Sequence, residues 1–134
     1  MTAYVLDSSA LLAYVDQRES AGKVAHLLKS AIRGEAEILM SAVNYGEVYS
    51  VALRERGRDR ALATLSMIRP LPIRFVDATP DRALHAAEVK IKYKLYYADS
   101  FAAALAMEYN AKLVTSDSDF RRLGHGFPIA WLKS

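Results

Sequence analysis

The sequence predicts an α/β domain with a central, mainly parallel sheet flanked by helices. Short apolar runs of strand length alternate along the chain with longer segments whose apolar residues recur at helical spacing. This alternation is typical of parallel sheets, because parallel strands are joined by crossover helices. The 134 residues contain no repeat and no low-complexity linker, so we expect a single domain over residues 1–134.

The first half of the chain is predicted to hold two strands and four helices. Val24 and Leu28 lie one helical turn apart, and Gly34 follows as a stop signal for their helix. Gly57 separates the last two helical segments. The predicted elements are a strand over 4–6, a helix over 10–14 capped by Ser8 and Ser9, a helix over 21–32, a strand over 38–40, and helices over 43–56 and 58–68.

Pro70 and Pro72 break the chain before the second half. Thr79 is expected to cap the helix that Pro80 opens, since proline suits the first helical turn. Trp131, on the final strand, is expected in the core. The remaining predicted elements are strands over 73–76, 112–115 and 129–131 and helices over 80–94, 98–109 and 117–123.

Composition excludes several classes of protein. Without cysteine, neither disulfides nor thiolate metal sites are possible. Charges interrupt every apolar stretch before it reaches the ~18 residues of a membrane span, and no signal peptide is apparent, so we predict a cytoplasmic protein that does not enter membranes. The net charge of +3 and the pI of about 9.2 are compatible with a nucleic-acid partner.

Four carboxylates come from separate segments that the predicted fold brings together. Asp7 and Asp117 follow apolar strands, and Asp99 lies in the first turn of an alanine-rich helix. Ligands of open parallel sheets bind beyond the carboxyl ends of the strands, which is where these residues fall. Each also has a structural interpretation: Asp7 as a turn residue, Asp117 as a helix cap, and Asp99 as a charge favourable at a helix N-terminus.

Glu47 lies at the edge of the apolar stripe of its helix, four residues after Val43 and four before Val51. A carboxylate in that position is half-buried and requires a partner. A structural salt bridge is one solution, and a shared site with the three aspartates is the other.

A cluster of these four acids favours a divalent cation. Two carboxylates about 4 Å apart repel by roughly 4 kcal/mol at an effective dielectric constant near 20. No lysine or arginine lies within the acidic motifs, and ligands that are all oxygen suit Mg²⁺ or Mn²⁺. Such an ion polarises a phosphoryl oxygen and lowers the pKa of a bound water, which suits phosphodiester hydrolysis.

Three stretches resemble the PIN-domain family, and specifically the VapC-type toxins of prokaryotic toxin–antitoxin pairs. They are residues 5–10 (VLDSSA), residues 41–48 (SAVNYGEV), and the pair formed by residues 98–104 (ADSFAAA) and 113–120 (LVTSDSDF). Each motif alone is weak, but their order and spacing cover most of the chain. The resemblance implies a PIN-like three-layer sandwich and a metal-dependent endoribonuclease.

The resemblance also assigns roles to residues. It implies that Asp7 and Asp99 are metal ligands, that Asp117 is a ligand or a near neighbour, and that Glu47 acts through water. Ser9 and Ser116 are expected to hydrogen-bond the carboxylates or a bound water, and Asp119 is auxiliary because it can equally cap the last helix. A small VapB-type antitoxin and a homodimer are the implied partners, for which the helices over 21–32 and 43–68 carry apolar surface.

RNA-contact candidates lie just before Asp99. Lys90, Lys92 and Lys94 form a basic run, and Tyr97 can stack on an unpaired base. A solvated helix face explains the same run of charges.

Three alternatives share parts of this pattern. A PIN-like nuclease with a housekeeping role in RNA maturation or DNA flap cleavage would use the same acids. A Mg²⁺-binding receiver module would need paired acids at the first strand and a lysine after a late strand, whereas Asp7 is followed by two serines and Val114 by Thr115 and Ser116. A catalytically inactive binding module would not require the complete acid set.

Overall fold

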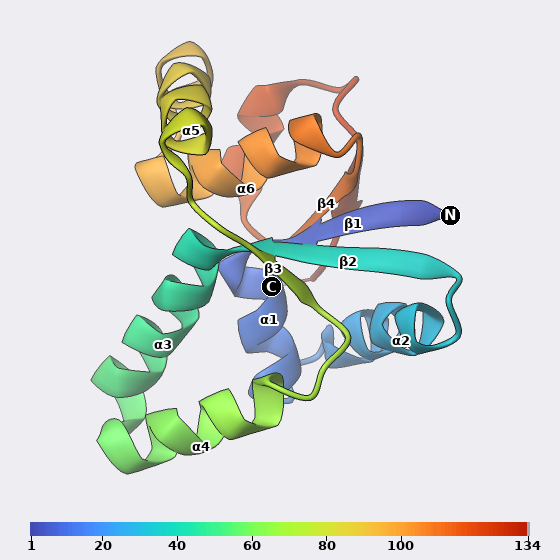
Figure 1. The fold of residues 1–134 in the computed structure, drawn as a ribbon, viewed down its shortest axis with the longest axis vertical. Helices are drawn as coiled ribbons and strands as arrows, with labels where there is room; N and C mark the ends of the chain where they lie inside the picture. The colour runs from blue at the N-terminus through green and yellow to red at the C-terminus, as the bar shows by residue number, and fades with distance from the viewer. Residues whose placement is uncertain (134) are drawn as a thin grey trace.

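The computed structural model describes residues 1–133, which alternate strands and helices from end to end (Figure 1). The elements are β1 (Thr2–Leu6), α1 (Ser8–Val15), α2 (Ala21–Ile32), β2 (Ala36–Ser41), α3 (Ala42–Arg56), α4 (Arg58–Ile68), β3 (Arg74–Val76), α5 (Pro80–Tyr93), α6 (Tyr97–Glu108), β4 (Lys112–Thr115), the 3-10 helix η1 (Ser118–Leu123) and β5 (Ile129–Trp131).

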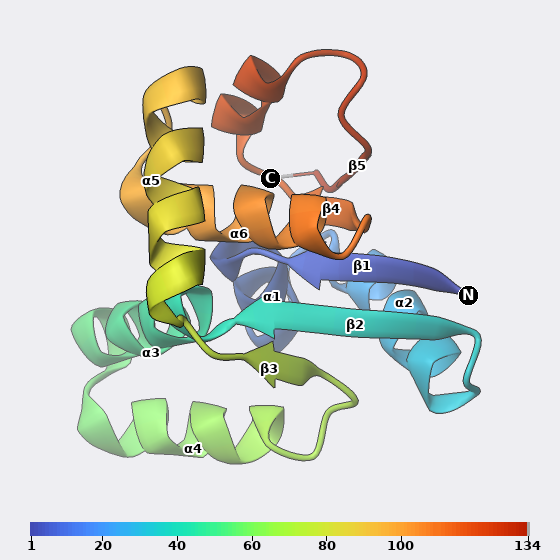
Figure 2. The same ribbon diagram turned by 45° about the horizontal axis from the view of Figure 1, so that its top comes forward.

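The strands form one sheet in the order β3-β2-β1-β4-β5, and each neighbouring pair is parallel. The chain moves outward from β1 through β2 to β3 and then crosses back to add β4 and β5 on the other side of β1. Because crossover connections are right-handed, this reversal places α1 to α4 on one side of the sheet and α5 and α6 on the other (Figure 2). The predicted α/β sandwich is confirmed, and the strand order reverses between β1 and β4.

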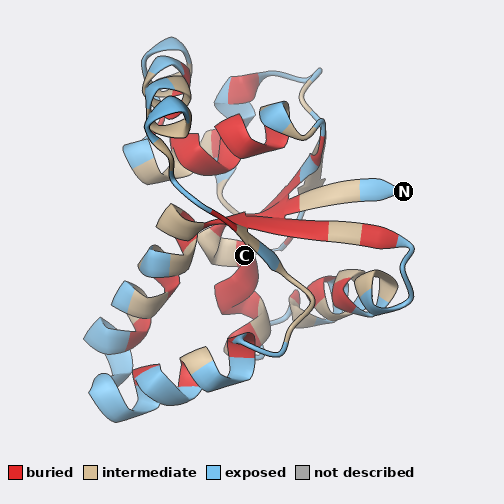
Figure 3. Ribbon diagram, viewed as in Figure 1, coloured by how far each residue is buried: buried red, intermediate tan, exposed pale blue. Residues whose placement is uncertain are grey.

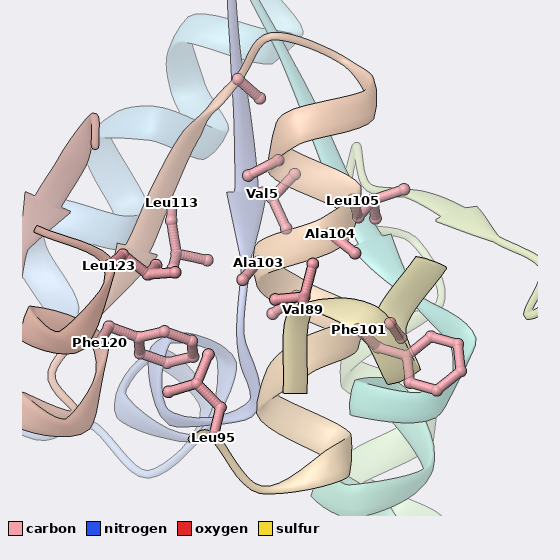
Figure 4. Close-up of a cluster of buried hydrophobic side chains, with 14 of the residues drawn as sticks. Val5, Val89, Leu95, Phe101, Ala103, Ala104, Leu105, Leu113, Phe120 and Leu123 are labelled. Atoms are coloured by element: carbon pink, nitrogen blue, oxygen red, sulfur yellow. The ribbon is translucent and has the colours of Figure 1, made fainter. Parts of the chain in front are cut away.

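Helix α6 lies directly against the sheet because its inner surface is made of small residues. Ala102 and Ala103 are fully buried and allow the helix backbone to approach β1 and β4. Val5 and Leu113 from these strands and Phe120 from η1 pack in the same cluster (Figure 4). Helix α5 packs on α6. This close packing fixes the N-terminal end of α6 beside the carboxyl ends of the strands.

The opposite face of the sheet is covered by α1 and α2, while α3 and α4 extend away from it (Figure 3). Leu11, Val24 and Ile38 are buried between these helices and the strands. Helices α3 and α4 bury one side and leave Leu62 and Met67 exposed. Among residues 1–133, no helix is both long enough and apolar enough to cross a membrane.

Two local predictions were wrong. Helix α1 is capped by Asp7, not by Ser8 and Ser9, because the extended backbone of Asp7 brings its carboxylate to the N–H of Ala10 and the serines are already helical. Trp131 is not in the core. Since β5 is an edge strand, its side chain remains 38% exposed, and the guanidinium of Arg121 lies 5.8 Å from the ring centroid.

Candidate metal centre

Asp7 is fixed at the junction of β1 and β4. Its N–H donates to the carbonyl of Val114 at 3.3 Å, which continues the pairing of the two strands. Its Oδ1 accepts from the Ser9 hydroxyl at 2.7 Å and from the Ala10 N–H at 2.9 Å, and its Oδ2 accepts from the Thr115 hydroxyl at 2.5 Å. The side chain is buried. Both carboxylate oxygens therefore already have partners within the protein.

The hydroxyls that hold Asp7 also position the backbone after β4. Thr115 Oγ1 accepts from the N–H of Asp117 at 2.9 Å, and Ser9 Oγ accepts from the N–H of Ser116 at 3.1 Å. Ser9 thus contacts a carboxylate as the sequence predicts, whereas Ser116 takes part through its backbone. Sequence reasoning missed Thr115, although it ends an apolar strand between the first and last acidic motifs.

Three aspartates converge where the strand order reverses. One carboxylate oxygen from each of Asp99, Asp117 and Asp119 lies within 4.8 Å of the others. Asp99 belongs to the first turn of α6, and Asp117 caps η1 by accepting from the N–H of Asp119 at 2.9 Å. Asp119, expected only as an auxiliary residue, lies in this group, whereas Asp7 and Glu47 lie next to it.

Glu47 is held at the edge of the cluster by Asn44, one turn earlier in α3. Asn44 is fully buried, and its Nδ2 donates to Glu47 Oε1 at 2.9 Å and to the carbonyl of Ala98 at 3.0 Å. Its Oδ1 is buried without a partner. Because Ala98 precedes Asp99, Asn44 connects Glu47 to the helix end that carries Asp99. Sequence reasoning missed Asn44, a polar residue on the inward face of its helix.

The electrostatics of the site disfavour negative charge. Burial raises the pKa of Asp99 from 3.8 to about 7, and the nearby carboxylates add to this, Asp117 and Glu47 before Asp7 and Asp119. Burial also raises the pKa of Asp7 to about 6, although its three hydrogen bonds act in the opposite direction. The five acids are therefore close enough to repel one another.

Protein cations compensate little of this repulsion. In the part of the chain that the structure describes, the ion pairs include Asp119, whose Oδ1 lies 3.7 Å from Nη2 of Arg122, but none includes Asp7, Asp99 or Asp117. Clustered carboxylate oxygens with raised pKa values and few protein counter-charges form a donor set that fits a hard divalent cation.

The RNA-contact candidates separate into two groups. Lys90 and Lys94 line a cleft that also includes Asp119. Lys92 does not line it and lies 5.3 Å from the ring centroid of Tyr93. Tyr97 packs edge-on against Phe101, and its hydroxyl donates to the carbonyl of Ala83 at 3.3 Å.

The parallel sheet and the carboxylates at its reversal point define an α/β protein with a candidate acidic metal centre. The sequence model of the PIN domain matches residues 4–126. The chain therefore belongs to the PIN-domain family. No curated protein sequence matches it.

Solved structures with the same fold include VapBC toxin–antitoxin proteins. VapBC2 from Rickettsia felis, bound to a DNA fragment from its promoter, is 15% identical, with a TM-score of 0.77 and coverage of 98% of this chain and 99% of that chain. DNA-bound VapBC from Salmonella typhimurium is 18% identical, with a TM-score of 0.74 and coverage of 97% and 98%. VapC20 from Mycobacterium tuberculosis, a Sarcin-Ricin loop cleaving toxin, is 19% identical, with a TM-score of 0.71 and coverage of 90% and 95%.

Proposed function

We propose that this protein is a Mg²⁺-dependent endoribonuclease, for which Mn²⁺ substitutes, and the toxin of a VapBC-type toxin–antitoxin pair. The observation that carries this proposal is the group of carboxylates from Asp99, Asp117 and Asp119 within 4.8 Å of one another at the strand-order reversal. Membership of the PIN-domain family supports a nuclease. The likeness to VapC20, which cleaves RNA of the sarcin–ricin loop, supports RNA as the substrate.

The three aspartates would hold the ion, and Asp7 and Glu47 would complete its surroundings. When bound, Mg²⁺ supplies charge stabilisation at the phosphoryl group and a water of lowered pKa. Asp7 keeps the ends of β1 and β4 together through its bonds to Ser9 and Thr115. Glu47, fixed by Asn44, presents its carboxylate toward the cluster and can orient a water there.

Exposed apolar residues of α3 and α4 support a protein partner. Leu53, Leu62 and Met67 are 37%, 40% and 49% exposed on these two adjoining helices. Several structural neighbours are complexes of a toxin with its antitoxin. We assign a VapB-type antitoxin to this surface, and a homodimer as the assembly that it would bind.

The test compares wild-type protein with Asp99→Asn under inducible expression, followed by sequencing of cleaved RNA ends. Purified protein is assayed with Mg²⁺, with Mn²⁺ and with a chelator. Asp59→Asn is the matched control, because Asp59 is also an aspartate in a first helical turn but is exposed on α4. We expect new RNA ends and growth arrest with wild type and Asp59→Asn only.

Asp7→Asn is a better second variant than Asp7→Ala, because alanine leaves three hydrogen-bond donors without an acceptor. If the wild-type protein cuts no RNA with either metal and behaves like Asp99→Asn in cells, the ribonuclease proposal is wrong.

A further inference from the structure

A cleft of about 570 Å³ lies between the C-terminal end of α5 and η1. Pockets that hold small ligands occupy about 300–1,000 Å³, so a nucleotide fits this volume. Its charged and aromatic lining consists of Lys90, Lys94, Tyr96, Asp119 and Arg122. Since Asp119 also belongs to the acid cluster, the cleft and the candidate metal centre share a wall.

Arg122 is held in a fixed position inside this cleft. Its Nη1 donates to the carbonyl of Lys94 at 2.9 Å, and its Nη2 lies 3.7 Å from Oδ1 of Asp119. Half of its side chain nevertheless remains exposed. The guanidinium is thus anchored at one side while it keeps donors for another ligand, and a planar guanidinium suits the oxygens of a phosphate.

The charge of the cleft favours an anion. Lys90, Lys94 and Arg122 contribute three positive charges, and Asp119 contributes one negative charge. Positive charge immediately beside a carboxylate cluster is what a polyanionic strand requires, because the carboxylates alone would repel its phosphates.

Tyr96 adds an aromatic surface to the cleft. Its side chain is 74% exposed, whereas its backbone is fixed because its carbonyl accepts from the N–H and the hydroxyl of Ser100 at 3.0 and 2.9 Å. An exposed ring on a fixed backbone next to cationic side chains is the arrangement that binds single-stranded nucleic acid by stacking. This role falls to Tyr96 because the neighbouring Tyr97 is packed on Phe101.

We propose that this cleft is a nucleotide subsite that holds one phosphate and one base of single-stranded RNA adjacent to the acid cluster. The subsite rests on the ribonuclease proposed above. A strand with its scissile phosphate at Asp99, Asp117 and Asp119 would place a neighbouring nucleotide against Lys90, Lys94 and Arg122, with its base on Tyr96.

Binding is measured separately from cleavage, in the Asp99→Asn background without divalent metal. The probe is a short fluorescein-labelled oligouridine, titrated at several salt concentrations. Lys90→Gln/Lys94→Gln is compared with Lys23→Gln/Lys29→Gln, which removes the same charge from α2 on the opposite face of the sheet. Tyr96→Leu is compared with Tyr96→Phe, which keeps the ring.

We expect the α5 pair to weaken binding and to lower the salt slope by about 1.4, or roughly 0.7 for each lost phosphate contact. The α2 pair should leave both quantities unchanged. Tyr96→Leu should weaken binding about fivefold or more relative to Tyr96→Phe, as expected for a lost stacking contact. Equal effects of the two lysine pairs, or tighter binding of oligothymidine than of oligouridine, would overturn the subsite.

The two proposals fail in different ways. Wild-type protein that cuts no RNA with Mg²⁺ contradicts the ribonuclease. Wild-type protein that cuts RNA while Lys90→Gln/Lys94→Gln, without the Asp99 substitution, shows an unchanged KM contradicts the subsite alone. A raised KM with an unchanged kcat is the expected result, because the cleft contacts a nucleotide beside the reacting phosphate.

Discussion

The hydroxyl of Thr115 lies 2.5 Å from Oδ2 of Asp7 and joins the ends of the two strands between which the sheet reverses. We expect Thr115→Val to lower the free energy of unfolding by about 1–3 kcal/mol at neutral pH, because Asp7 loses a donor in a buried position. Urea denaturation measures this. Thr115→Ser, which keeps the hydroxyl, should behave like wild type, and an equal loss in both variants would point to packing instead.

The repulsion among the acids predicts that the cluster destabilises the metal-free protein. Asp99→Asn removes the most perturbed carboxylate and should raise the thermal unfolding midpoint at pH 7 in a chelator. Mg²⁺ at about 100 times its dissociation constant should stabilise wild type by about 2.7 kcal/mol and the variant far less. Asp59→Asn should respond to Mg²⁺ as wild type does. If Mg²⁺ stabilises Asp99→Asn fully, the ion is held elsewhere.

The pH dependence of stability follows from the raised pKa values of Asp7 and Asp99, about 6 and about 7. Between 3.8 and these values the folded protein holds protons that the unfolded chain releases, so stability is lost as the pH rises through this window. Chelator-treated wild type should therefore unfold more easily at pH 7 than at pH 5. Urea titrations at fixed pH measure the slope, which Asp99→Asn should reduce. A stability that rises from pH 5 to pH 7 equally in both proteins would contradict this origin.

Asn44 predicts a difference between stability and activity. Asn44→Leu removes two hydrogen bonds but also removes the buried Oδ1 that has no partner, so the free energy of unfolding should change by only about 1 kcal/mol. Cleavage should fall about tenfold, since a displaced catalytic carboxylate costs activity even where its chemistry is intact. Initial rates and urea denaturation are compared directly. A fall in activity that merely follows a loss of folded protein would reduce Asn44 to a packing residue.

The sequence predicts the elements and their order because apolar periodicity is a local property. The helix over 21–32 and the strand over 112–115 have the same bounds in the structure as in the prediction. Local pattern also marks the ends of strands as the place for Asp7 and Asp117, because parallel strands align their carboxyl ends. Trp131 was misplaced because hydrophobicity does not reveal that its strand lies at the edge of the sheet.

The finer composition of the site depends on contacts between distant segments. Asp119 joins Asp99 because η1 turns its first residues toward α6, and no spacing along the chain reveals this. Thr115 binds Asp7 across 108 positions, and Asn44 reaches Ala98 across 54. A better reading of residues 41–48 would have noted Asn44, since an asparagine one turn before Glu47 on the inward face needs partners.

The central place of β1 in the sheet has a consequence for synthesis of the protein on the ribosome. Leu6, made among the first residues, pairs with Val114, made among the last, and the aspartates of the cluster come from α6 and the segment after β4. A growing chain that ends before residue 119 lacks part of the cluster and one of the two neighbours of β1. The proposed nuclease would therefore become active only when translation of its own message is almost complete.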